Sequence, residues 1–356
     1  MIPRNATALV LAATAMLAAV VPLRAADESP AAKPVKEVAD RRLPVTTPAG
    51  SGELALYLSR DWSRPLPGVT RAVIVIHGRL RNADVYRASA EKALAAAGEA
   101  DQPTILVVPQ FLSETDAETH HLPAGTLRWG TTGWEGGGDA RGPAPISAFA
   151  GLDAILAKLA DRALFPDLTT IVVAGHSGGG QVVQRYAILG QGEAAPIAAG
   201  VAVRYVVANP SSYAYFSPDR PDGEGGFAPF AGAASCPKFD RWKYGMADLP
   251  SYAGAATPAA VEQAYLGRDV TYLLGTADTD PNHPALDKSC MAEAQGPYRL
   301  ARGEAYIRYL RGRHPDGFRQ RLLLVQGVGH DGDRMLTSAC GLAALFDRPG
   351  CVPSIP

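Results

Sequence analysis

The sequence has few of the features that mark proteins binding nucleic acid, zinc or phosphate. It has 34 basic and 35 acidic residues, which give a formal net charge of −1, and it contains no basic run. Both observations argue against nucleic acid as the main partner. The four cysteines include no Cys-x-x-Cys pair, which argues against a zinc site. The glycine-rich stretch 175–180 is not followed by Gly-Lys-Ser or Gly-Lys-Thr, so it does not have the pattern of a phosphate-binding loop.

The longest apolar run near the start of the chain, residues 8–21, is too short for a stable membrane anchor. A helical span needs roughly 20 apolar residues, and Pro22 interrupts this run. Arg4 precedes the run, and the small residue Ala25 follows it at a position suited to cleavage. We therefore interpret residues 1–25 as a signal peptide and expect a secreted or periplasmic protein.

The rest of the chain divides into a short leading segment and a long folded region. Residues 26–50 are rich in Pro, Ala, Lys and Glu, which predicts a flexible mature N-terminus. Residues 51–356 are expected to form the folded domain.

The cysteine count favours disulfide bonds, because an even number in an exported chain is typical of paired cysteines. Cys340 and Cys351 are close in sequence, and a Pro-Gly pair between them allows a turn, so we favour this pairing. It leaves Cys236 with Cys290. Four buried free thiols remain the alternative.

Short apolar runs alternate with helical patterns along the folded region. Runs that are apolar on both faces are typical of strands in a covered parallel sheet. We therefore predict an α/β fold with a mostly parallel sheet and helices on both faces. The expected strands are 73–76, 105–108, 171–174, 205–208, 272–274 and 322–325, with a possible antiparallel edge strand at 54–58, and the expected helices are 84–97, 147–163, 179–189, 258–266, 297–311 and 334–346.

Two long segments, 111–145 and 211–257, interrupt this alternation. Loops of this length in a folded domain are often functional, so we expect a lid or a pocket wall. Their aromatic residues either line a pocket or form a small core under the loops: Trp129, Trp134, Tyr213, Tyr215 and Trp242.

Ser177 stands at the turn between an expected strand and an expected helix. The stretch reads Gly-His-Ser-Gly-Gly and fits the pattern Gly-x-Ser-x-Gly, which presents a serine hydroxyl at a sharp strand-to-helix turn. The amino terminus of the following helix favours developing negative charge. A plain glycine-rich turn is the alternative interpretation.

A serine nucleophile needs a base, and the base needs an orienting acid. His330 follows the last expected strand and is our candidate base. Asp278 follows the strand at 272–274 and is our candidate acid, with Asp280 as the alternative. Asp278, Asp280 and Asn282 also resemble the start of a calcium-binding loop, but the later positions of an EF-hand do not match. A structural calcium ion stays open.

The chain order Ser177, Asp278, His330 is that of the α/β-hydrolase triad. With Val-Ile-His-Gly-Arg at 75–79, Gly-Thr-Ala-Asp at 275–278 and Gly-His at 329–330, the sequence resembles the α/β-hydrolase superfamily from about residue 54 onward. In an acyl transfer, the N–H of Gly178 would be one donor to the oxyanion. The resemblance implies that the N–H of Arg79 is the second.

These residues predict an exported serine hydrolase that cleaves a carboxylic ester through an acyl-enzyme. The chemistry requires no cofactor and no metal. The expected partner is a small-molecule or polymeric ester, whereas the oligomeric state is not predicted. A serine peptidase or amidase on the same fold is the first alternative, and a non-catalytic binding protein is the second.

Overall fold

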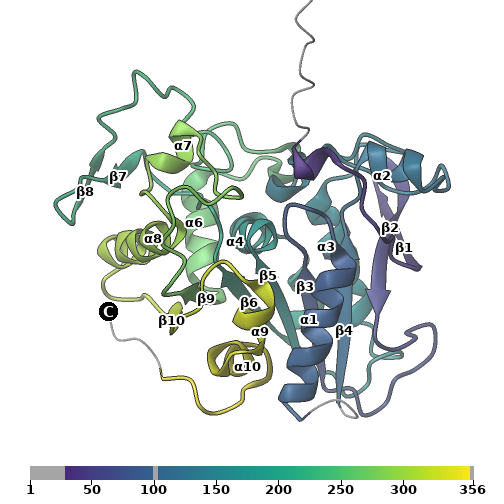
Figure 1. Cartoon of the computed structure of the whole chain (residues 1–356). Coiled ribbons are helices and arrows are strands. Elements are labelled where there is room, and N and C mark those ends of the chain that lie inside the picture. Colours follow the sequence, from purple (N-terminus) through teal and green to yellow (C-terminus); the bar gives the residue numbers. More distant parts are fainter. Residues whose placement is uncertain (1–28, 99–102, 353–356) are drawn as a thin grey trace, which may run out of the picture.

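The computed structural model describes residues 29–98 and 103–352. The predicted signal peptide at residues 1–25 therefore lies outside the described residues. In this part of the chain, eight strands form one mixed sheet in the order β1-β2-β4-β3-β5-β6-β9-β10 (Figure 1). Their bounds are β1 Arg41–Thr47, β2 Gly50–Leu58, β3 Arg71–Ile76, β4 Thr104–Gln110, β5 Thr170–His176, β6 Ala202–Ala208, β9 Asp269–Gly275 and β10 Arg321–Val325.

The direction of the strands confirms the predicted, mostly parallel sheet. From β4 to β10 every neighbouring pair is parallel, whereas β1 pairs with β2 and β2 with β4 in antiparallel fashion. A separate hairpin consists of β7 Asp219–Pro221 and β8 Phe227–Pro229.

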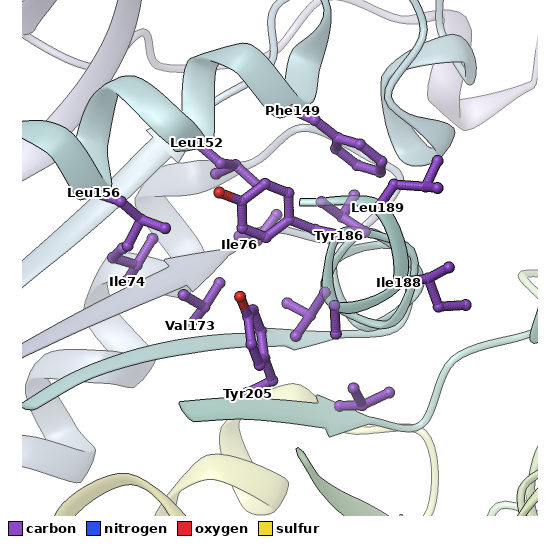
Figure 2. Close-up of a cluster of buried hydrophobic side chains, with 14 of the residues drawn as sticks. Ile74, Ile76, Phe149, Leu152, Leu156, Val173, Tyr186, Ile188, Leu189 and Tyr205 are labelled. Atoms are coloured by element: carbon purple, nitrogen blue, oxygen red, sulfur yellow. The ribbon is translucent and has the colours of Figure 1, made fainter. Parts of the chain in front are cut away.

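Helices cover both faces of the sheet, because the central strands are apolar on both sides. Alternate residues of β3 belong to two different buried clusters: Ile74 and Ile76 to one, Val73 and Val75 to the other. Figure 2 shows Ile74 and Ile76 in the first cluster, beside apolar side chains of two helices. That face is covered by α3 Ala148–Leu159, α4 Gly178–Leu189, α6 Pro258–Leu266 and α8 Arg299–Arg313, and the opposite face by α1 Ala83–Ala96, α9 Gly332–Thr337 and α10 Ala339–Phe346.

The helices agree with the predicted ones except near the C-terminus. The helix expected at 334–346 is divided into α9 and α10 at Ser338, which has an extended backbone. Its hydroxyl accepts a hydrogen bond from the N–H of Gly341 and so begins a new helix. Short helices that were not predicted are α2 Glu114–Thr119, α5 Ala194–Ala198 and α7 Cys290–Glu293, with 3-10 turns at Pro30–Ala32, Gly133–Gly136 and Ser251–Ala253.

The N-terminal segment differs from the expectation. Residues 26–50 were predicted to be flexible, but from residue 29 onward they pack against the sheet and include β1. The N–H of Val35 donates to Asp116, and the N–H of Ala39 donates to Gln110, each at 2.8 Å. Composition could not reveal these partners, because both polar side chains lie far away in sequence. The expected strand 54–58 is antiparallel but lies inside the sheet, since β1 covers it.

Both favoured disulfide pairings are confirmed. Cys236 is bonded to Cys290, and Cys340 to Cys351. The first bond joins the long segment 211–257 to α7, and the second joins α10 to the chain beyond it. Within residues 29–98 and 103–352, no helix is long and apolar enough to cross a membrane.

Candidate active site

The candidate site residues converge at the carboxyl ends of parallel strands. Ser177 directly follows β5, and Arg79 lies three residues beyond β3. Asp278 follows β9, and His330 follows β10 after a short loop. Because these strands run in the same direction, their ends meet at one edge of the sheet, where open α/β sheets bind their ligands.

The turn at Ser177 holds the serine in a strained conformation. Its φ of 59° and ψ of −119° lie in a region that residues other than glycine rarely occupy. A Cβ on Gly179 would overlap the carbonyl oxygen of Ile76, and one on Gly175 would overlap the backbone of Gly179. Only glycine fits at these two positions, so the sequence pattern is required by close backbone packing. The turn presents the hydroxyl of Ser177 at the amino terminus of α4.

His330 connects the serine to a buried carboxylate. Its Nε2 lies 2.9 Å from Oγ of Ser177, and its Nδ1 lies 2.9 Å from Oδ2 of Asp278. A carboxylate only accepts hydrogen bonds, so Nδ1 carries the proton and Nε2 accepts from the hydroxyl. Burial lowers the pKa of His330 below its ordinary value, and the nearby charge of Arg299 lowers it further, against the opposing effect of Asp278. The imidazole is therefore neutral at pH 7 and can accept a proton.

The structure brings Asp278, and not Asp280, to the imidazole. Asp278 is only 3% exposed, whereas Asp280 is exposed and accepts a hydrogen bond from the N–H of Asn282. The structure does not support a calcium site at Asp278 and Asp280. The described residues contain no group of three or more His, Cys, Asp or Glu side chains that could hold a metal ion.

Arg299 is a partner of Asp278 that sequence reasoning missed. Its Nη1 lies 3.3 Å from Oδ1 of Asp278, the oxygen that His330 does not use, and both side chains are buried. Nε of Arg299 donates to the hydroxyl of Ser211. Arg299 begins α8, and nothing in the spacing of the sequence indicates that this helix packs against the loop after β9.

The two expected oxyanion donors lie side by side. Gly178 is the first residue of α4, so its N–H has no partner within the helix. A Cβ built on Gly178 would lie 2.8 Å from the backbone nitrogen of Arg79. The main chains after β3 and β5 therefore approach each other next to Ser177.

Other residues of the loop after β3 fix its shape. Nδ1 of His77 donates to the carbonyl oxygen of Gly78, and its Nε2 accepts from the N–H of Phe111. Burial lowers the pKa of His77 to about 4, so the ring is neutral. Arg81 forms a fully buried ion pair with Asp116 at 2.6 Å, and it therefore does not face the cleft.

Most aromatic residues of the two long segments belong to the core. Trp129, Trp134, Tyr213 and Tyr215 are fully buried, and Trp134 stacks on Phe111 at a centroid distance of 5.3 Å. Trp242 is half-buried, and its ring N–H donates to a backbone carbonyl. These aromatics form core packing under the loops and do not line the cavities at Ser177.

Two cavities meet at Ser177. The larger, of about 530 Å³, lies between α1, the N-terminal segment and the loop that carries His330. The smaller, of about 200 Å³, is bounded by Gly178 and by residues of both long segments, including Glu135 and Lys243. The long segments therefore form pocket walls, as the sequence predicts.

Two further histidines flank His330. The ring centroid of His176 lies 4.6 Å from that of His330. The ring centroid of His283 lies 5.0 Å from that of His330, and these two rings are arranged edge to face. Nδ1 of His176 is 3.2 Å from the hydroxyl of Tyr86. Burial lowers the pKa of His176 well below its ordinary value, so this ring is neutral beside His330.

The fold is similar to that of solved hydrolases. A poly(aspartic acid) hydrolase from Sphingomonas sp. KT-1 is 26% identical, with a TM-score of 0.55 over 85% of this chain and 96% of that one. A poly(3-hydroxybutyrate) depolymerase from Bordetella parapertussis is 24% identical, with a TM-score of 0.57 over 87% of this chain and 91% of that one. The chain matches no protein-family model and no curated relative.

The sheet order, the parallel crossovers and these similarities define the class of protein. The chain has the α/β-hydrolase fold, and the resemblance to the α/β-hydrolase superfamily that its sequence suggests is supported by these solved structures. The solved structures it resembles are hydrolases, which supports hydrolase activity for this chain.

Proposed function

We propose that the protein is an exported serine hydrolase that cleaves a carboxylic ester. The observation that carries this proposal is the continuous hydrogen-bonded chain from Ser177 through His330 to Asp278. This arrangement is the one that activates a serine hydroxyl in unrelated hydrolase folds.

In the proposed reaction, Oγ of Ser177 attacks the ester carbonyl while Nε2 of His330 takes its proton. The N–H groups of Arg79 and Gly178 donate to the oxyanion of the tetrahedral intermediate. His330 then gives its proton to the departing alcohol, which leaves the acyl group on Ser177. A water molecule activated by His330 attacks the acyl-enzyme and releases the acid. Asp278 stabilises the imidazolium in both steps.

Covalent labelling tests the proposal directly. A fluorophosphonate should react with Ser177 and lose fluoride, and the Ser177→Ala variant should take no label. His330→Ala should lower turnover of ester substrates by about 10³-fold or more with little change in melting temperature. A well-folded wild-type protein that takes no label would favour a binding protein on the hydrolase scaffold.

Amide cleavage by the same residues is the second candidate. One observation favours amide cleavage. The similar Sphingomonas structure is named for the hydrolysis of poly(aspartic acid), which is a polyamide. The triad serves either bond, because only the leaving group differs. Matched ester and amide substrates of one acyl group, measured with a single preparation, would separate the two.

We also propose that the protein acts outside the cytoplasm, in a secreted or periplasmic form. Its two disulfide bonds support this location, because such bonds persist in oxidising compartments. The pattern of residues 1–25 supports it independently. The proposed substrate is a small-molecule or polymeric ester.

A further inference from the structure

The two cavities at Ser177 differ in the chemistry of their walls. The surface of the larger one is mainly apolar and includes Pro30, Leu80, Val85 and Pro284, although Asn82, Asp331 and Asp333 also line it. The smaller one presents polar side chains: Gln181, Glu135, Lys243, Tyr244 and Asp287. A substrate that spans both cavities therefore meets an apolar wall on one side of the serine and a polar wall on the other.

Glu135 gives the smaller cavity a buried polar atom without a partner. The side chain is about 95% buried, being 5% exposed. Among the described residues, its Oε1 has no hydrogen-bond partner, and its Oε2 lies 3.7 Å from Nζ of Lys243. Oε1 is 3.3 Å from the position that a Cβ on Gly178 would occupy. A buried acceptor without a partner is costly, so this atom indicates a bonding partner supplied from outside the chain.

The charges around the smaller cavity balance. Glu135 and Asp287 are acidic, and Lys243 and Arg79 are basic. Asp287 already accepts hydrogen bonds from the hydroxyl of Tyr244 and the N–H of Ser289. Burial raises the pKa of Glu135 and lowers that of Lys243, so both groups are shifted toward their neutral forms. This environment suits a neutral hydrogen-bonding group better than an ion.

The positions of His330 and Gly178 assign the two parts of an ester to the two cavities. His330 lines only the larger cavity, and Gly178 lines only the smaller one. The proton from His330 goes to the departing alcohol, so the alcohol must lie on the His330 side. The acyl chain then extends past Gly178 into the smaller cavity.

We propose that the smaller cavity binds the acyl part of the ester and selects a short chain with a neutral hydrogen-bonding substituent, such as a hydroxyl, near the carbonyl. Glu135 accepts the hydrogen bond of that hydroxyl. The larger cavity holds an apolar alcohol. This inference rests on the proposed function, because it uses His330 as the proton donor to the leaving group.

Matched ethyl esters test the inference. Ethyl 3-hydroxybutanoate and ethyl 3-methylbutanoate differ only by a hydroxyl in place of a methyl group. We expect kcat/KM to favour the hydroxy ester by about tenfold or more, because a site built to bind a hydroxyl rejects an analogue without one. The corresponding 3-ammonium and 3-carboxylate esters should be poorer substrates than the hydroxy ester.

Variants show whether Glu135 carries the preference. Glu135→Leu should reduce the hydroxy-to-methyl ratio to about one, whereas Glu91→Gln, on the exposed surface of α1, should keep the wild-type ratio. Comparing ratios removes the difference in intrinsic reactivity between the esters. If the Glu135→Leu variant has a melting temperature far below that of the wild type, Glu135→Ala is used in its place.

The possible failures are distinguishable. If Ser177 takes a fluorophosphonate and the esters are cleaved, but the wild-type ratio is close to one, only the inference on the smaller cavity is overturned. A preference for the ammonium or carboxylate ester overturns it as well. If Ser177 takes no label, the proposed function itself fails. If turnover is too slow to measure, the two amides 3-hydroxybutanamide and 3-methylbutanamide give the same comparison. Each is tested for how well it protects Ser177 from the fluorophosphonate.

Discussion

At the scale of single residues, Arg299 links the proposed triad to the rest of the site. It binds the oxygen of Asp278 that faces away from His330, and it is buried together with that carboxylate. An arginine in this position holds the carboxylate in one orientation. Its charge also lowers the pKa of His330. We therefore regard Arg299 as a positioning residue that acts through Asp278.

Replacing Arg299 should change the pH dependence of the reaction. His330 must be neutral to act as a base, so kcat/KM falls as the pH drops through its pKa. Arg299→Met removes a charge that lowers this pKa, and the acidic limb should therefore move to higher pH. Arg299→Lys keeps the charge and should leave the limb close to its wild-type position. Profiles of kcat/KM against pH for the three proteins provide the measurement, and identical limbs in all three would contradict this role.

The sequence identifies the three proposed triad residues but not their neighbours. Ser177, Asp278 and His330 each follow an apolar run, and parallel strands bring such positions together without further information. The structure also separates Asp278 from Asp280, which the sequence left open. Arg299 and Glu135 lie outside the pattern of strand ends. Their positions near the site depend on how α8 and the segment 111–145 fold over the sheet, and no local sequence pattern predicts this.

At the scale of elements, the turn between β5 and α4 depends on backbone contacts that exclude side chains. The strand ends, the chain reverses at Ser177, and α4 starts at once against the ends of β3 and β6. The N–H of Ser177 donates to the carbonyl oxygen of Ala208 in β6 at 3.0 Å. Gly179 faces β3 closely enough that a methyl group would overlap the carbonyl oxygen of Ile76.

Gly179→Ala should therefore destabilise the fold by about 3 kcal/mol or more, because neither backbone can move without disturbing the sheet. Gly312→Ala is the matched control, since Gly312 is also helical but a Cβ there meets nothing within 4 Å. That variant should gain about 0.5 to 1 kcal/mol from helix propensity. Denaturant unfolding of both variants measures the two effects. Equal stability of the two would show that the turn tolerates a side chain.

The elements that the sequence predicts well are those with a strong local pattern. All six continuous apolar runs are strands of the sheet, because burial on both faces requires apolar residues throughout. β1 was missed, since its residues alternate between buried and exposed positions and contain a proline. The division between α9 and α10 was missed because one capping serine interrupts an otherwise helical pattern.

At the scale of the whole molecule, the two disulfide bonds should contribute unequally to stability. The bond Cys236–Cys290 spans a sequence separation of 54, and the bond Cys340–Cys351 spans 11. Chain entropy predicts stabilisation of about 4 kcal/mol for the longer loop and about 3 kcal/mol for the shorter.

Double alanine variants of each pair test this order. Scanning calorimetry should give a lower melting temperature for each variant than for the oxidised wild type, with the larger loss for the pair at 236 and 290. Reduction of the wild type should lower its melting temperature below that of either variant, because both bonds are then lost. Unchanged melting after reduction, with four thiols titrated, would contradict a stabilising role for the bonds.

The N-terminal segment joins distant parts of the molecule and forms part of the candidate site. Arg81 donates to the carbonyl oxygens of Ala31 and Lys33, and its partner Asp116 accepts from the N–H of Val35. Pro30 also lines the larger cavity. The segment therefore covers a buried ion pair and closes one side of the pocket that we assign to the alcohol.

A chain that begins at Arg41 should be both less stable and less selective than one that begins at Ala26. It lacks the three backbone groups that hydrogen-bond to Arg81 and Asp116, and the ion pair is left uncovered, which should cost about 2 to 5 kcal/mol because hydrogen bonds to charged groups are worth about 1 to 3 kcal/mol each. The loss of one pocket wall should raise KM for esters of bulky apolar alcohols more than for ethyl esters. Calorimetry and steady-state kinetics on the two chains measure both effects. Equal melting temperatures would mean that the segment is dispensable for folding, and an unchanged ratio of KM values would remove it from the substrate pocket.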